Sequence, residues 1–206
     1  MIAILLICAY IEHLIIFWYY SLIWSIKNQI VLYNCKHSPL TVATYAIKIQ
    51  LTVLPPLGCI FYYFYSQLGT DVIYALPQFN KGELYQWMFM LLWEEIIFYH
   101  VHRILHHPKL YHIHKLHHTW TRPVPWEALY SSIPENIIIN FFPVLSAPYI
   151  VSLNIYYLYI WVALATITSV ISHSNFNMSH TAHHKYFNVN FGTTRFFDII
   201  YGTNRW

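Results

Sequence analysis

The chain has 206 residues, of which 57% are hydrophobic, 19% aromatic and only 9% charged. Soluble domains carry roughly a quarter of their residues as charged ones, so this composition indicates a membrane protein. A net charge of +3 with scattered basic residues argues against nucleic-acid binding, and three cysteines without metal-like spacing predict no disulfide framework.

Four apolar stretches are long enough to cross a membrane, which takes about 20 helical residues. They cover residues 2–26, 41–65, 84–101 and 137–171. The first is too long for a removable signal peptide, and it lacks a basic start and a cleavage site. The second contains Pro55 and Pro56, which predict a kink. The fourth holds no Lys, Arg, Asp or Glu, and we expect it to form a helical hairpin that turns near Ser152 to Asn154.

The expected fold is an all-α membrane protein with about four transmembrane helices. Basic residues follow the first, third and last stretches, so the positive-inside rule predicts that these segments face the cytosol. Residues 102–136 and 172–206 then lie on one face of the membrane and form a cytosolic helical cap. We expect residues 1–83 to supply N-terminal transmembrane helices and residues 84–206 to form a second unit that contains the hairpin 137–171.

Histidines are concentrated in this cap, because twelve of the fourteen lie between positions 100 and 184. They fall into the motifs HRILH (102–106), HKLHH (114–118) and HTAHH (180–184). On a helix, residues three and four positions apart project from one face, so each motif presents two or three imidazoles together. Imidazole binds iron, copper, zinc and nickel, and a tetrahedral zinc needs only about four ligands. Eight convergent histidines, or nine with His173, therefore predict two metal ions.

Other interpretations apply to single histidines and to the site as a whole. Four histidines outside the motifs are interpreted as ordinary interfacial or hydrogen-bonded residues: His13, His37, His100 and His112. His107 competes with His106 for the first motif. A metal transporter would need polar ligands through the depth of the membrane, and a zinc hydrolase would need an HExxH motif. The sequence shows neither feature, and it has no pair of ExxH motifs typical of ferritin-like di-iron sites.

With their flanks, these motifs resemble the fatty acid hydroxylase/sterol desaturase superfamily of membrane di-iron oxygenases. The resemblance runs from about Glu94 to Arg205. It is carried by EEIIFYHVHRILHHPKLYHIHKLHHTWTRPVPWEALYSSIPE, which starts at Glu94, and by HSNFNMSHTAHHKYFNVNFGTTRFFDIIYGT, which starts at His173. It implies that residues 84–206 form a fatty acid hydroxylase-type di-iron domain. The implied iron ligands are His102, His106, His114, His117, His118, His173, His180, His183 and His184.

The resemblance also implies roles for polar residues around the metal ions. Glu95 and Asp198 are candidates for carboxylates that orient ligand imidazoles, with a helix-end charge and a helix or turn cap as the alternatives. Asn177 stands where relatives can carry a tenth histidine, and it could hold a water on one metal. Glu135 is expected to cap or brace the segment that enters the hairpin.

The implied function is that of a membrane non-haem di-iron oxygenase that hydroxylates a lipid C–H bond, in a sterol or a fatty-acyl chain. The implied cofactors are two iron ions, which would use O2 and electrons from a separate donor, cytochrome b5 or a reductase with NAD(P)H. In a eukaryotic cell we expect the endoplasmic reticulum membrane. Two alternatives stay open: a lipid or sterol desaturase with the same metal centre, and a non-catalytic membrane metal-binding protein.

Overall fold

The computed structural model describes residues 1–27, 39–121, 123–174 and 178–205. This part of the chain folds into helices joined by turns and contains no strand, which confirms the expected all-α fold. Within it, three helical stretches are long and apolar enough to cross a membrane: Ile2–Ile26, Leu40–Tyr65 and Ile155–Ser172.

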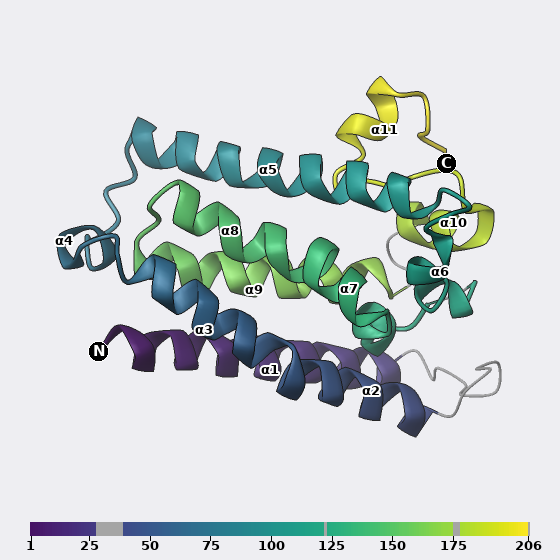
Figure 1. Cartoon of the computed structure of the whole chain (residues 1–206), viewed down its shortest axis with the longest axis horizontal. Helices are drawn as coiled ribbons and strands as arrows, with labels where there is room; N and C mark the ends of the chain where they lie inside the picture. The colour runs from purple at the N-terminus through teal and green to yellow at the C-terminus, as the bar shows by residue number, and fades with distance from the viewer. Residues whose placement is uncertain (28–38, 122, 175–177, 206) are drawn as a thin grey trace.

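The first and third of these stretches pack side by side, and the second is broken into two helices. Helix α1 (Ile2–Lys27) lies along α9 (Ile155–Ser172), and both run toward the end of the molecule where α10 lies (Figure 1). The second stretch is divided into α2 (Pro39–Thr52) and α3 (Leu54–Tyr65). The break falls at Val53, because the prolines that follow occupy the first turn of α3 and cannot donate the hydrogen bonds of a continuous helix. The predicted kink is therefore confirmed.

Helix α5 (Lys81–Leu105) covers the third predicted stretch and is longer than expected. It starts at a capping box, in which Glu83 N donates to Asn80 Oδ1 at 3.0 Å and Asn80 N donates to Glu83 Oε2 at 3.2 Å. Polar side chains such as Glu94 and Glu95 lower its hydropathy, so it falls outside the three stretches that qualify as membrane spans.

The fourth stretch forms the expected hairpin. The π-helix η4 (Asn136–Phe141) continues into α8 (Phe142–Ile150), and a turn joins α8 to α9. The turn falls where the sequence predicts it, since Ser152 has a φ of +52° and Asn154 caps α9 by accepting from Tyr157 N at 3.0 Å.

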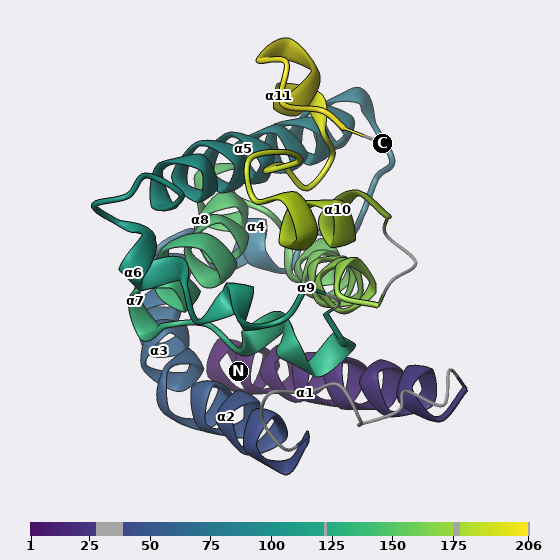
Figure 2. The same ribbon diagram turned by 90° about the vertical axis from the view of Figure 1, so that its right-hand side faces the viewer.

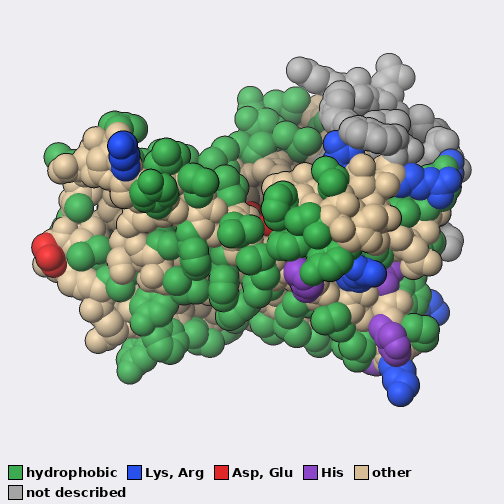
Figure 3. All heavy atoms as spheres, turned by 90° about the horizontal axis from the view of Figure 1, so that it is seen from above, with side chains coloured by type: hydrophobic (Ala, Val, Ile, Leu, Met, Phe, Trp, Pro, Cys, Tyr) green, Lys and Arg blue, Asp and Glu red, His purple; other side chains and the backbone are tan. Residues whose placement is uncertain are grey.

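The remaining elements are short and mostly gather at one end of the bundle, which Figure 2 views end on. They are α4 (Thr70–Ile73), α6 (Tyr111–His114), η2 (His117–Thr119), η3 (Pro125–Leu129), α7 (Ile133–Glu135), α10 (Met178–Tyr186) and α11 (Phe196–Ile200). On the face shown in Figure 3, apolar side chains cover much of the length of the molecule, and most visible Lys, Arg and His side chains lie at one end. We call this the histidine end.

Two apolar clusters hold the long helices together. One packs around Tyr65 and Trp161, where the Tyr65 hydroxyl also donates to the Leu153 carbonyl oxygen at 2.6 Å. The other packs around Phe17 and Phe141. Lipid tails are as apolar as these side chains, so close van der Waals packing and hydrogen bonds such as that of Tyr65 hold the long helices on which the histidine end is built.

Candidate metal centre

Nine imidazoles gather at the histidine end in two groups, and all nine belong to the set predicted from the sequence. In each group, one ring nitrogen from every residue lies within 4.8 Å of all the others. The group of five consists of His102, His106, His114, His118 and His183. The group of four consists of His117, His173, His180 and His184.

The second and third histidine motifs are divided between the groups, whereas both histidines of the first motif belong to the group of five. In the second motif, α6 ends at His114 and His117 begins a 3-10 turn, with His118 at φ −81° and ψ 23°. The expected continuous helix is therefore absent, and His117 joins the group of four while its neighbours join the group of five. On α10, His183 likewise belongs to the group of five, whereas His180 and His184, one turn apart, belong to the other.

Backbone carbonyls fix the orientation of several rings. His102 Nδ1 donates to Phe191 O at 2.7 Å, and His183 Nδ1 donates to Val189 O at 2.7 Å. In the group of four, His173 Nδ1 donates to Ser169 O and His184 Nδ1 to Trp120 O, both at 2.9 Å. A carbonyl oxygen can only accept, so these four Nδ1 atoms carry the proton and the Nε2 atoms keep a bare lone pair.

The bare Nε2 atoms point into the centre of each group. His102 Nε2 lies 3.1 Å from His114 Nε2, and His173 Nε2 lies 3.1 Å from His180 Nε2. Burial lowers the pKa of His102 and of His173 to about 4, so both are neutral at pH 7. Each group thus aims at least two buried lone pairs at one point, which is unfavourable unless a cation lies between them. The donor set therefore fits two metal ions.

Glu135 touches both groups. Its Oε1 lies 2.8 Å from His114 Nδ1 and 3.9 Å from His117 Nδ1. Burial raises the pKa of Glu135 well above its usual range, and bound cations would oppose that shift. Sequence reasoning expected Glu135 to cap or brace this segment, whereas the helix cap is Ser132 Oγ, which accepts from Glu135 N at 3.3 Å. Because Glu135 and His114 are 21 residues apart in the sequence, no local pattern predicts the contact between the Glu135 carboxylate and the His114 imidazole.

Glu95 and Asp198 act on the site through a loop. Glu95 Oε2 accepts from Thr193 N and Thr194 N at 2.8 Å. Asp198 accepts from the backbone N of Phe191 and Gly192, also at 2.8 Å. The Phe191 carbonyl in this loop accepts from His102. The two carboxylates therefore position the loop, and the loop positions the imidazole, whereas the sequence suggested that the carboxylates contact an imidazole directly. The loop approaches so closely that a Cβ at residue 192 would collide with Glu95 Oε1.

The other described histidines lie outside the two groups. His107 Nδ1 accepts from Lys109 N at 3.3 Å, which leaves His106 in the group of five. His100 and His112 bond to backbone carbonyl oxygens through Nδ1, at 2.8 Å and 3.1 Å. His13 contacts Thr166 within the bundle. Two residues of the sequence prediction, His37 and Asn177, lie outside the described residues.

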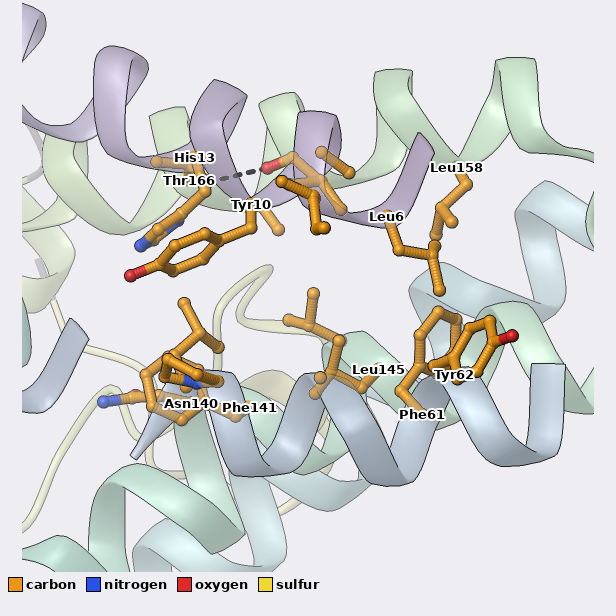
Figure 4. A pocket seen from close by; sticks show the side chains of 18 of the residues that line it. Leu6, Tyr10, His13, Phe61, Tyr62, Asn140, Phe141, Leu145, Leu158 and Thr166 are labelled. Atoms are coloured by element: carbon orange, nitrogen blue, oxygen red, sulfur yellow. Dashed lines mark hydrogen bonds between the residues drawn. The ribbon is translucent and has the colours of Figure 1, made fainter. Parts of the chain in front are cut away.

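Two neighbouring cavities lie at the metal centre and between the long helices beside it. The larger, about 370 Å³, is walled by α1, α3, α8 and α9 and is almost entirely apolar. The smaller, about 90 Å³, is lined by histidines of both groups and by Glu135. Asn140, Val144, Ala165 and Ser169 line both cavities, so the two are neighbours across these side chains. Figure 4 shows part of the wall of the larger one.

Comparisons with known proteins place this arrangement in a family. The model of the fatty acid hydroxylase family matches residues 87–203. Fatty acid hydroxylase domain-containing protein 2 of Macaca fascicularis is 32% identical over 163 residues, which are 75% of this chain and 49% of that protein. A fatty acid hydroxylase of Mycosarcoma maydis is 31% identical over 183 residues, 82% of this chain and 48% of that protein.

A Delta(7)-sterol 5(6)-desaturase of Leptosphaeria maculans is 30% identical over 156 residues, 66% of this chain and 42% of that protein. The chain thus spans about half the length, or less, of the curated relatives it matches. No solved structure matches it. The family match covers more than half of the chain and includes all nine clustered histidines. The chain therefore belongs to the fatty acid hydroxylase/sterol desaturase superfamily.

Proposed function

We propose that this protein is a membrane non-haem di-iron oxygenase that hydroxylates a C–H bond of a lipid. The observation that carries the proposal is the position of the two histidine groups. Histidines of both groups line a small cavity, and four side chains of that cavity also line the large apolar one. The named relatives, a fatty acid hydroxylase and a sterol desaturase, support the same class of chemistry.

The two histidine groups would each hold one iron ion, with Glu135 beside both. When bound, the iron pair supplies the redox activation of O2 that an unactivated C–H bond requires and that zinc, which has no redox chemistry, does not offer. The overall change places one oxygen atom in the lipid and releases the other as water, and it consumes two electrons and two protons. The chain contributes imidazoles that burial keeps neutral and whose Nδ1 hydrogen bonds fix the tautomer and the ring orientation, as at His102 and His184.

The lipid would enter sideways from the bilayer. The exposed residues that line the larger cavity are Ala3 and Ile7 on α1 and Cys59 and Tyr62 on α3. Both helices belong to stretches able to cross a membrane, so an opening between them faces lipid rather than water. An apolar wall also keeps bulk water from the reacting carbon.

The electrons would come from a separate protein, cytochrome b5 or a reductase that uses NAD(P)H. The positive-inside rule supports a cytosolic histidine end, and the endoplasmic reticulum is the expected membrane in a eukaryotic cell. A desaturase is the second candidate, because the Leptosphaeria maculans relative is a sterol desaturase and removing two hydrogens needs the same metal centre.

Lipid profiling under ¹⁸O2 tests the proposal. Membranes that contain the full chain and an electron donor should form a lipid with one ¹⁸O atom. A variant with His117→Ala and His118→Ala should form none, and a matched His112→Ala variant, which changes a histidine outside both groups, should behave like the wild type. A new double bond without ¹⁸O would select the desaturase, and no lipid change would refute both.

A further inference from the structure

Helix α11 points its apolar side chains away from the protein and its carboxylate toward it. Phe196, Ile199 and Ile200 are exposed over 52%, 67% and 57% of their surface, whereas Asp198 is completely buried. A surface helix in water shows the reverse pattern, because apolar side chains gain by leaving water and charged ones lose by leaving it. The outer surface of α11 therefore suits a lipid environment rather than an aqueous one.

The place of α11 in the fold supports the same conclusion. Figure 1 shows α11 on the outer side of α5, level with the last turns of α1 and α9 before the histidine end. In the end-on view of Figure 2, α11 is the outermost helix on this side of the bundle. The stretches Ile2–Ile26 and Ile155–Ser172 are able to span a membrane, so their last turns mark the depth of the headgroup layer. Helix α11 lies at that depth.

An exposed apolar face of α5 continues to α11. Met88 and Leu92 are exposed and, being one turn apart, project from one side of the helix. The same side carries Tyr99 and Arg103 farther along, where α5 contacts α11 and the Tyr201 that follows it. A side of the bundle that faces lipid needs a continuous apolar surface of this kind, and α11 forms the end of that surface nearest the histidines.

Tyr201 and Arg103 lie at the edge of this surface. Tyr201 is half exposed and its ring stacks on Tyr99, with the ring centroids 5.5 Å apart. The Arg103 guanidinium lies 5.5 Å from the centre of the Tyr201 ring, and its Nη1 donates to Tyr99 Oη at 3.0 Å. Tyrosine and arginine combine an apolar body with a polar end and are typical of the border between lipid and water. A lipid phosphate would also find a cation in Arg103.

Asp198 connects this surface to the metal centre. Its Oδ1 accepts from Phe191 N and its Oδ2 from Gly192 N, both at 2.8 Å, and Thr203 Oγ1 donates to Oδ1 at 2.7 Å. The Phe191 carbonyl in turn accepts from His102 Nδ1 at 2.7 Å. A displacement of α11 therefore reaches a histidine of the group of five through one carboxylate and one loop.

We propose that α11 is embedded in the headgroup layer of the membrane at the histidine end, and that this contact with lipid holds Asp198 and its loop in place beside His102. The partner is the surface of a lipid bilayer, in which acyl carbons meet Ile199 and Ile200 and headgroup phosphates meet Arg103. The inference concerns the contact between the chain and the membrane, so it is independent of the reaction at the metal centre.

Spin-label accessibility tests the depth of α11. The full chain, with its three cysteines replaced by alanine, is placed in nanodiscs of phosphatidylcholine and phosphatidylserine and labelled at Ile199→Cys or at Lys109→Cys. The label at 199 should collide more with O2, which concentrates in lipid, than with a water-soluble nickel complex. The label at 109, an exposed position at the same end, should show the reverse. The proposal is overturned if the label at 199 reports water, or if a partner protein or a second copy shields it from both reagents.

Hydrogen exchange in the metal-free chain, again in nanodiscs, tests the link between α11 and the loop. The double variant Ile199→Ser and Ile200→Ser weakens the contact with lipid and leaves Asp198 unchanged. The backbone amides of Phe191 and Gly192 donate to that carboxylate, so they should exchange on the order of tenfold faster than in the wild type. This readout needs neither bound metal nor turnover.

A second pair of serine substitutions provides the matched control. Ile15→Ser with Ile160→Ser changes two exposed isoleucines on α1 and α9, which carry neither Asp198 nor the loop. Exchange at residues 191 and 192 should then stay at the wild-type rate. Unchanged exchange in the α11 variant, or equally faster exchange in both double variants, would contradict the proposal.

Discussion

The two histidine groups are held in place by different kinds of contact. In the group of five, His102 and His183 donate to carbonyls of residues 191 and 189, in a loop that Asp198 fastens at Phe191 and Gly192. In the group of four, His173 bonds to Ser169 O one turn earlier, at the end of α9. The group of five thus depends on a loop whose Phe191 is 89 residues from His102 in the sequence. The group of four depends partly on local helix geometry. Substitutions should therefore separate the two sites.

The largest effect is expected when one ligand is removed from one group. His183 and His184 are neighbours on α10 but belong to different groups. We expect His183→Ala and His184→Ala each to lose about one of two bound irons and to reduce lipid oxidation by on the order of 100-fold or more, because an open ligand position loosens the metal. Metal analysis and product formation measure this. Lys185→Ala, the next residue, is the control, and full iron in either histidine variant would argue against two separate sites.

Glu135→Gln should weaken both groups together. The amide keeps an oxygen for His114 Nδ1 but loses the negative charge beside two cations, so we expect about a 10- to 100-fold loss in metal affinity. Competition with a chelator measures it. Glu127→Gln is the matched control, because burial raises the pKa of Glu127 to about 9, which leaves it already uncharged at pH 7. An equal loss in both variants would contradict an electrostatic role for Glu135 beside the two groups.

Gly192→Ala should disturb the group of five alone. The added Cβ collides with Glu95 Oε1 and shifts the loop whose Phe191 carbonyl accepts from His102. We expect a destabilisation of about 1–3 kcal/mol in thermal unfolding and a loss of iron from one group. Gly58→Ala is the control, since a Cβ there meets nothing within 4 Å. Equal iron loss from both groups would mean that the loop does not act on one site only.

Ser172→Ala should have the smallest effect. Ser172 Oγ lies 3.0 Å from His173 Nδ1, but Ser169 O at 2.9 Å remains as the acceptor. We expect a change of about 1 kcal/mol or less in stability and a few-fold change at most in metal affinity. A complete loss of metal from the group of four would show that the Ser169 carbonyl does not hold the ring by itself.

Sequence patterns could predict the elements of the fold better than the arrangement within the site. The kink at Val53 and the turn near Ser152 follow from proline and hairpin rules that act locally. The predicted topology, with residues 102–136 and 172–206 on one face of the membrane, also placed all nine clustered histidines at one end of the molecule. Motif spacing failed to divide them between two groups, because a shared helical face requires a continuous helix, and the helix is interrupted between His114 and His117.

Long-range contacts were the second limit. Whether Glu95 meets an imidazole or a loop depends on where residues 191–194 lie, and no local pattern encodes a pairing 98 residues apart. Glu135 is a second example. The sequence predicts only a cap or brace at the entrance of the hairpin, and Glu135 contacts His114 because α6 and α7 pack together.

The most direct measurement of the central claim is the metal content of the purified full chain, by mass spectrometry and iron spectroscopy. Two groups that each direct bare imidazole lone pairs to one point predict close to two irons per chain, and a variant that combines His118→Ala with His184→Ala should carry almost none. A wild-type chain that holds zinc, a single metal ion or no metal after reconstitution with ferrous iron would contradict the account.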